Sequence, residues 1–260
     1  MDNNSSDNND YINAFLNTYI NTVNLISDAL KNAFTETPDV ENIGFDILSN
    51  NNSNIKEPSI TERFNYVITH GFENGAYGEY LTKYLVDNNL TWYKKTLNNV
   101  YLPYKGKTSE IDIILITEKG IYVIESKNYS GWIFGSVEQN YWTQSLNQYT
   151  KYRFYNPIIQ NRTHITALSE YLKINRSFFH SYIVFSERCE LMKIPCNTNE
   201  YTITKREYLI EKLSTDIRKK RKILSSEEID RIESALLPYT NVSEDVKKKH
   251  IDNINNNHNN

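Results

Sequence analysis

Apolar side chains recur along the chain with two different periods, and each period predicts one type of element. From residue 11 to residue 30, and again from about Ala76 through "GAYGEYLTKYLVDN", they return every three or four positions, which is typical of an amphipathic helix. Residues 109–128, "SEIDIILITEKGIYVIESKN", instead hold two apolar runs around a charged turn that ends in Gly120. This pattern predicts a β-hairpin, and the apolarity of both faces of each run predicts strands in the centre of a sheet.

The segments around the hairpin predict further strands and helices. We expect a strand near 92–102, short strands in "GWIFGS" and "YWTQSL", a buried strand in "HSYIVFS" and edge strands in "CELMKI" and "YTITK". Asn156 and Pro157 are typical of a helix start, and this helix should continue through "NPIIQNRTHITALSEYLKI". Two more helices are expected at 207–222 and 226–238. This order predicts an α/β fold in which helices flank a sheet.

Composition divides the chain into a core and its extensions. Residues 1–9 and 241–260 are rich in Asn and charged residues, which indicates mobile tails. Residues 10–60 comprise the N-terminal helix and a connection, residues 61–200 the predicted core, and residues 201–240 a C-terminal helical extension. The N-terminal helix is expected to pack on its own domain. The alternative is a homodimer or larger assembly through the N-terminal or C-terminal helices.

Composition also narrows the classes of partner. With a net charge of -3 and a pI near 6.0, the chain has no global attraction to nucleic acid, so such binding requires local basic surface. The run "RKKRK" at 218–222 is a candidate, although such runs are commonly the solvated face of a helix. Cys189 and Cys196 fit neither a disulfide framework nor a common zinc pattern. No apolar stretch approaches the roughly 20 residues of a membrane span, and no secretory leader is visible, which predicts a soluble cytoplasmic protein.

Charged residues interrupt both apolar runs of the hairpin. If the loop has two residues, counting back from it places Asp112 opposite Glu125, and Lys127 shares the face of Glu125 because side chains alternate. A one-residue bulge at Gly120 would instead turn Asp112 to the other face. Adjacent carboxylates repel each other unless a cation lies between them, and one lysine cannot satisfy both. The pattern therefore favours a site for a hard divalent cation over a structural ion pair.

Asp112, followed on the next strand by Glu125, Ser126 and Lys127, resembles the signature of the PD-(D/E)xK nuclease superfamily, although isoleucine replaces the proline before the Asp. More narrowly, the chain from Gly75 to Phe185 resembles the nuclease-related domain, NERD. The segments that carry this resemblance are "GAYGEYLTKYL", "LPYKGKTSEIDIILITEKGIYVIESKNYSGWIFGS", "YWTQ" and "NPIIQNRTHITAL". The resemblance implies a restriction-endonuclease-like fold, with a mixed central sheet flanked by helices.

The resemblance also implies a metal site. Asp112 and Glu125 would ligate Mg²⁺ or Mn²⁺, helped by the backbone carbonyl of Ser126. Glu79 would be a further acid, supplied by the first helix of the core. The metal would act as a Lewis acid and lower the pKa of its bound water.

Two further residues receive roles from the resemblance. Lys127 would orient or deprotonate the attacking water and offset charge on the phosphate, and Gln160 would contact the scissile phosphate or a metal-bound water. The implied activity is metal-dependent hydrolysis of phosphodiester bonds, most simply by a DNA endonuclease. The alternative is a catalytically silent module that keeps the nuclease fold and binds nucleic acid or a protein partner.

Several of these residues have a purely structural alternative. Glu79 precedes a lysine by one helical turn, a spacing that also makes ordinary surface ion pairs. Gln160 and His164 lie one turn apart, so either could simply cap or solvate its helix, and His164 is also a candidate metal ligand. Trp132 and Trp142 are expected in the core rather than as stacking platforms for bases.

Overall fold

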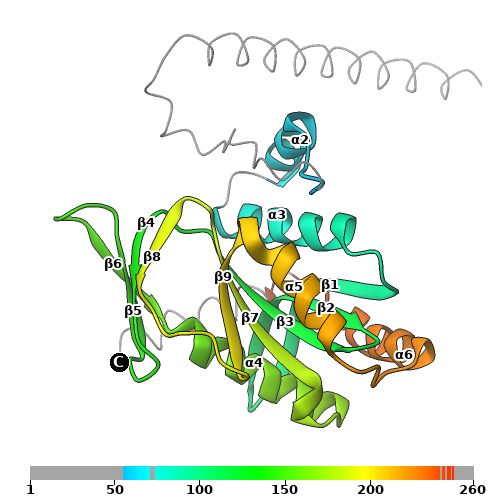
Figure 1. The fold of residues 1–260 in the computed structure, drawn as a ribbon. Helices are drawn as coiled ribbons and strands as arrows, with labels where there is room; N and C mark the ends of the chain where they lie inside the picture. Colours follow the sequence, from blue (N-terminus) through cyan, green and yellow to red (C-terminus); the bar gives the residue numbers. More distant parts are fainter. Residues whose placement is uncertain (1–54, 71–73, 241, 244, 247, 249–260) are drawn as a thin grey trace, which may run out of the picture. The chain divides into compact units, whose positions relative to one another are not determined.

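The computed structural model describes residues 55–70, 74–240, 242–243, 245–246 and 248 (Figure 1). The predicted helix at 11–30 and the first predicted tail lie outside these residues, as do most of the last tail and most of the connection before residue 60. Residues 59–65 belong to one compact unit, and residues 55–58 and those from 66 onward belong to another.

Helix α2, Ile60–His70, is absent from the sequence prediction. Its start nevertheless carries a capping signal. The backbone N–H of Ser59 donates to Glu62 Oε2 at 2.7 Å, and the N–H of Glu62 donates to Ser59 Oγ at 3.2 Å. This reciprocal pair is the capping box that S-x-x-E predicts. The box was overlooked because the residues before it resemble an irregular connection.

The second unit alternates strands with helices. Its helices are α3 (Asn74–Asn89), α4 (Pro157–Leu172), α5 (Leu209–Lys219) and α6 (Ser226–Leu236), with short 3₁₀ helices η2 (Arg176–Phe178), η3 (Arg206–Tyr208) and η4 (Leu237–Tyr239). Its strands are β1 (Lys94–Tyr104), β2 (Lys107–Thr117), β3 (Gly120–Lys127), β4 (Gly131–Phe134), β5 (Tyr141–Ser145), β6 (Lys151–Tyr155), β7 (Phe179–Phe185), β8 (Cys189–Lys193) and β9 (Tyr201–Lys205).

The strands form two mixed sheets. The larger has the order β1-β2-β3-β7-β9, antiparallel as far as β3 and parallel from β3 to β9. The smaller has the order β6-β5-β4-β8. The α/β class and the edge positions of β8 and β9 are thus confirmed, and the short strands predicted in "GWIFGS" and "YWTQSL" are β4 and β5 of the smaller sheet. The side chains of Ile133, Trp142 and Phe154, one from each of β4, β5 and β6, are buried in one cluster with residues of β7 and β9. The smaller sheet therefore packs as a separate layer against these two strands.

The hairpin has the predicted register. Thr117 pairs with Gly120 and Ile113 with Ile124, so the loop has two residues and no bulge shifts the strands. Both strands lie inside the five-stranded sheet, as their apolar faces predict. The hairpin is therefore the central element of the fold.

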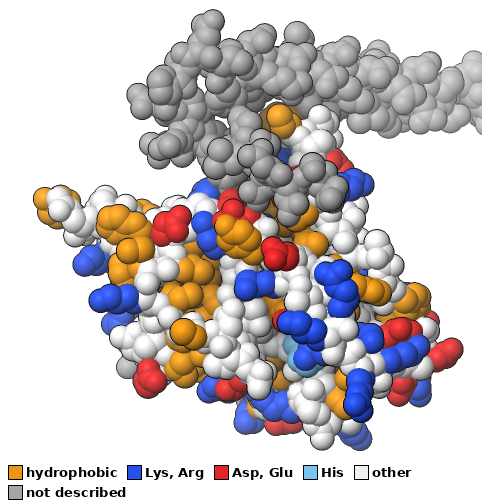
Figure 2. Space-filling view, viewed as in Figure 1, with side chains coloured by type: hydrophobic (Ala, Val, Ile, Leu, Met, Phe, Trp, Pro, Cys, Tyr) orange, Lys and Arg blue, Asp and Glu red, His pale blue; other side chains and the backbone are white. Residues whose placement is uncertain are grey.

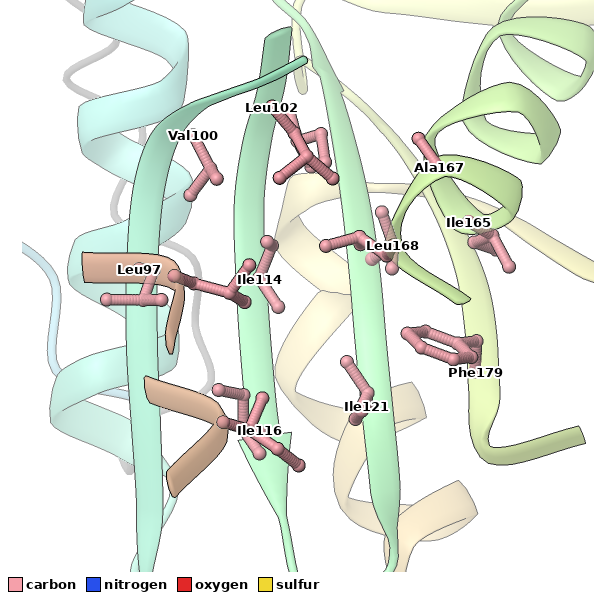
Figure 3. Close-up of a cluster of buried hydrophobic side chains, with 14 of the residues drawn as sticks. Leu97, Val100, Leu102, Ile114, Ile116, Ile121, Ile165, Ala167, Leu168 and Phe179 are labelled. Atoms are coloured by element: carbon pink, nitrogen blue, oxygen red, sulfur yellow. The ribbon is translucent and has the colours of Figure 1, made fainter. Parts of the chain in front are cut away.

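Helices cover both faces of the larger sheet (Figure 1). Ile114 and Ile116 of β2 pack toward α4 and α6, and Figure 3 shows them in one cluster with Leu168 of α4. Ile113 and Leu115 pack toward α3 and α5 on the opposite face. All four hairpin residues are completely buried. Since each fully buried side chain of this size contributes roughly 1.5–3 kcal/mol, the hairpin anchors both layers.

The C-terminal helices are shorter than predicted, because α5 ends at Lys219 within the basic run 218–222. The run then turns back to the hairpin loop. Lys222 Nζ lies 2.5 Å from Glu118 Oε1, and Lys119 Nζ donates to the carbonyl of Lys220 at 2.8 Å. The residues after α5 are therefore fastened to the tip of the hairpin. In the described part of the chain, every helix is too short or too polar to cross a membrane.

His180, near the start of β7, predicts a pH dependence of stability. Burial and the charge of Lys220 lower the pKa of His180 from 6.5 to about 4. The unfolded chain takes up this proton near pH 6.5 and the folded chain only near pH 4, so stability is lost as the pH falls through this window, by up to about 3 kcal/mol. Urea unfolding at pH 7 and pH 4 should show that the stability of the wild type relative to His180→Asn falls by this amount. A difference that does not change with pH would contradict the prediction.

Candidate active site

The predicted charged cluster forms at the end of the hairpin that lies away from its loop. Asp112 Oδ2 accepts a hydrogen bond of 2.8 Å from the backbone N–H of Ser126. This bond joins β2 to β3 beyond Ile113 and Ile124, the pair of the two strands farthest from the loop. Lys127 Nζ lies 2.6 Å from Glu125 Oε1, as expected for alternate residues on one face of a strand. The structure thus brings together Asp112, Glu125 and Lys127.

Helix α4 adds two side chains from one face. Gln160 Oε1 accepts a hydrogen bond of 3.1 Å from Lys127 Nζ. One turn further on, His164 Nε2 lies 3.2 Å from Glu125 Oε2, and His164 Nδ1 lies 2.7 Å from Ser109 Oγ. The alternative in which Gln160 and His164 only cap or solvate their helix is therefore wrong, because both contact the charged residues of β3.

The N-terminal cap of α4 is the sequence signal that positions Gln160 and His164. Asn156 Oδ1 accepts from the N–H of Ile158 at 2.9 Å, and Pro157 occupies the first turn, as predicted. The side-chain amide of Asn156 also donates to the carbonyl of Gln139 at 2.7 Å. The cap thus fixes where α4 begins relative to the loop after β4.

Burial makes the charges of the cluster interdependent. Burial raises the pKa of Asp112 well above its usual range, and the charges of Glu125 and Glu79 raise it further. Burial alone would also raise the pKa of Glu125, but the charge of Lys127 and the contact with His164 outweigh it and lower the pKa. Burial alone would lower the pKa of Lys127, yet the charge of Glu125 prevails and raises it. Glu125 and Lys127 therefore form the ion pair, and Asp112 carries the unrelieved repulsion.

Glu79 lies on α3, on the other side of the sheet, and its charge acts on the cluster. Its side chain is half-buried, and its charge is close enough to raise the pKa of Asp112. The lysine one turn later, Lys83, makes its ion pair with Asp87. The neighbouring Gly78 lets α3 approach β3 closely, since a Cβ there would lie 2.5 Å from Asn128 Cβ. A larger residue at 78 would push Glu79 away from the carboxylates.

Behind the cluster lies a buried arginine that sequence reasoning missed. Arg206, in η3, is only 3% exposed. Its Nε donates to Thr82 Oγ1 at 3.2 Å, its Nη2 to Asn128 Oδ1 at 3.1 Å, and its Nη1 lies 3.0 Å from Glu187 Oε2. Thr82 Oγ1 is in turn 3.1 Å from Ser126 Oγ. One guanidinium thus ties α3 to the end of β3. No sequence signal marks it, because its partners come from distant parts of the chain.

Trp132 and Trp142, the two tryptophans of the smaller sheet, differ in their environments. Trp142 is completely buried in the smaller sheet, as expected, whereas Trp132 is 48% exposed, so its assignment to the core was wrong. In β4 the side chain of Ile133 points inward and is fully buried, which turns the adjacent Trp132 outward. Short strands that cover one side of a core expose every second residue, however apolar that residue is.

The donor set suits a hard divalent cation held by few protein ligands. Beyond the contacts with Lys127 and His164, neither buried oxygen of Glu125 has a hydrogen-bond partner among the described residues. Within the same residues, no three His, Cys, Asp or Glu side chains converge closely enough to hold a metal. Mg²⁺ is commonly bound through one or two carboxylates and retains several waters, so Asp112 and Glu125 fit this mode of binding.

Comparison with known proteins agrees with this geometry. A family model described as the nuclease-related domain matches residues 74–186. An uncharacterized protein of Bacillus anthracis is 32% identical over 181 residues, which cover 68% of this chain and 82% of the relative. The chain belongs to the nuclease-related domain family. No solved structure matches it. The matched range of this NERD protein includes every predicted site residue but ends before Arg206, which therefore joins the site from outside the matched domain.

The two carboxylates of the NERD site should respond differently to neutralisation. Asp112→Asn keeps an acceptor for the Ser126 N–H and removes repulsion, so metal-free protein should be at least as stable as wild type. Glu125→Gln leaves the Lys127 ammonium without its partner and should cost about 3 kcal/mol. Urea unfolding in EDTA measures both. Equal destabilisation by the two substitutions would show that the ion pair does not distinguish them.

The Arg206 contacts predict a large effect from a residue outside the matched domain. Arg206→Met keeps much of the apolar volume but removes the guanidinium contacts of Glu187 and Thr82, which should cost about 3 kcal/mol. Arg162→Met is the matched control, because Arg162 forms an exposed pair with Glu200 at 2.8 Å and should cost less than about 1 kcal/mol. Chemical unfolding of both variants tests this. Similar losses would mean that the buried contacts of Arg206 contribute no more to stability than an exposed ion pair does.

Proposed function

We propose that this NERD protein is an endonuclease that hydrolyses phosphodiester bonds of DNA and depends on Mg²⁺ or Mn²⁺. Membership of the family indicates a nuclease-related function. The observation that carries the finer proposal is the convergence of Asp112, Glu125 and Lys127 at one end of the hairpin. Carboxylates beside an ammonium are the groups that a phosphodiester hydrolase needs to hold a metal and to balance charge on the phosphate.

The acidic side chains would form the metal site. Asp112 and Glu125 would hold the ion together with the carbonyl of Ser126, and Glu79 would add negative charge from α3. The metal, when bound, would supply Lewis acidity and a water of lowered pKa. His164 would keep Glu125 in place, since it contacts one carboxylate oxygen and is itself held by Ser109.

Lys127 would act as a charged donor. A lysine ammonium offers three N–H donors and no acceptor, and here it contacts Glu125 Oε1 and Gln160 Oε1. Its remaining donor capacity suits a phosphate oxygen or the attacking water, on which it would offset or orient charge. Gln160 would hold the ammonium against β3. This arrangement favours orientation and charge stabilisation over removal of a proton by Lys127.

A catalytically silent module that binds nucleic acid or a protein partner is the second candidate. It is favoured by the lack, among the described residues, of a third metal-ligating side chain that converges with the two carboxylates. Such a module would keep the same ion pair and core. It would lack both cleavage and a stabilising response to metal.

Nicking of supercoiled plasmid DNA in Mg²⁺, Mn²⁺ or EDTA tests the proposal. Wild type should cut only with metal, and metal should raise its melting temperature, since a ligand of the folded state stabilises it. Lys127→Ala should lower the cleavage rate by at least about 100-fold, while the thermal response to metal persists. Asp112→Asn and Glu125→Gln should lose both responses.

Lys248→Ala, which removes the charge of an exposed lysine outside the site, serves as the control and should cut like wild type. Cleavage by Lys127→Ala at the wild-type rate would remove Lys127 from the mechanism. If neither Mg²⁺ nor Mn²⁺ produced cleavage or stabilisation, a shift of DNA by the protein in a gel-shift assay would favour the binding module.

A further inference from the structure

A cavity lies at the end of the larger sheet opposite the candidate active site, where β3 and β7 begin. Its volume is about 740 Å³, and its walls come from the starts of these two strands, the loop before β9, η2 and one side of α5. This volume falls within the range of small-molecule sites, roughly 300–1,000 Å³. The residues of the NERD site are absent from its lining, so the two sites are separate.

Two polar atoms in the cavity wall lack the partners that buried groups normally have. The side chain of Tyr122 is completely buried, and its Oη has no hydrogen-bond partner among the described residues. The same holds for His180 Nε2. The two rings are neighbours, with centroids 4.9 Å apart, and both residues line the cavity. Since unpartnered buried polar groups are rare and costly, a polar ligand at this position would account for them.

The charges of the lining are unbalanced in favour of cations. Arg176, Lys212 and Lys220 line the cavity, and none of them makes an ion pair within the described part of the chain. Lysine and arginine side chains gather over α5 on the face drawn in Figure 2. Uncompensated cations around a hollow attract anions and raise their local concentration.

The acidic residues of the lining are already engaged. Glu200 Oε1 lies 2.8 Å from Arg162 Nε, and Asp216 accepts a hydrogen bond from the hydroxyl of Tyr182. Glu200 is thus paired with an arginine outside the lining, whereas Asp216 keeps its negative charge and offsets one of the three lining cations. The lining therefore keeps a net surplus of positive charge beside an unused hydroxyl donor.

We propose that this cavity binds a small phosphorylated ligand of about the size of a mononucleotide. Lys212, Lys220 and Arg176 would contact the phosphate, and Tyr122 would donate its unused hydroxyl hydrogen. The cavity is larger than phosphate alone requires, and its aromatic and amide side chains, such as those of Tyr182 and Asn197, suit an organic group. This binding is independent of the proposed cleavage reaction, because it involves neither the carboxylates nor the metal.

Calorimetric titration of the full chain with AMP and with inorganic pyrophosphate, in EDTA and at constant ionic strength, tests the proposal. At least one probe should bind with a stoichiometry near one. Lys212→Ala and Lys220→Ala should each weaken binding by at least about tenfold, since each removes a charge-assisted contact, and Tyr122→Phe should weaken it by removing one hydroxyl.

Lys219→Ala is the matched control. Like Lys212→Ala, it removes one positive charge from α5. Lys219 is exposed and does not line the cavity, so binding should be unchanged. Lys127→Ala should also bind normally, which separates this proposal from the nuclease proposal. The assignment is overturned if neither probe binds or if Lys219→Ala weakens binding as much as the cavity variants do.

Discussion

The two-residue loop of the β2–β3 hairpin is the constraint on which the candidate site depends. Its pairing of Thr117 with Gly120 sets the register of the hairpin, and a shift of one residue would move Asp112 to the other face of the sheet. The packing of Ile113 and Ile124 supports the same register, since a slip would move these completely buried side chains from the α3 and α5 layer to the α4 and α6 layer. Core packing and site geometry therefore require one alignment of the two strands.

The electrostatics of the cluster follow from this alignment. Two carboxylates share a buried place with a single ammonium, so the Glu125–Lys127 pair leaves Asp112 in an unfavourable environment. A purely structural ion pair would need only one carboxylate for this ammonium. A metal-dependent hydrolase requires such a surplus of carboxylates where its cation binds. The repulsion at Asp112 is therefore consistent with the proposed activity.

Residues both inside and outside the range matched by the family model hold the site in place. Helix α4, inside the matched range, holds Glu125 and Lys127 through His164 and Gln160. Arg206, beyond the matched range, holds the end of β3 from behind, through Thr82 and Asn128. The C-terminal extension is thus joined to the domain by a buried guanidinium. The same extension supplies two cations of the cavity at the other end of the sheet, Lys212 from α5 and Lys220 directly after it.

The sequence alone determined the elements whose signals are local. Hairpin periodicity, the two-residue turn and the Asn156-Pro157 cap act between residues close in the chain, so they predicted the register, the start of α4 and the meeting of Asp112 with Glu125. Only the tertiary structure decided the second sheet, the exposure of Trp132, the contact of His164 with Glu125 and the role of Arg206. These features depend on which faces meet after the chain has packed. Contacts between residues as distant as Thr82 and Arg206 leave no periodic trace, because their energy arises only when burial removes water from both groups.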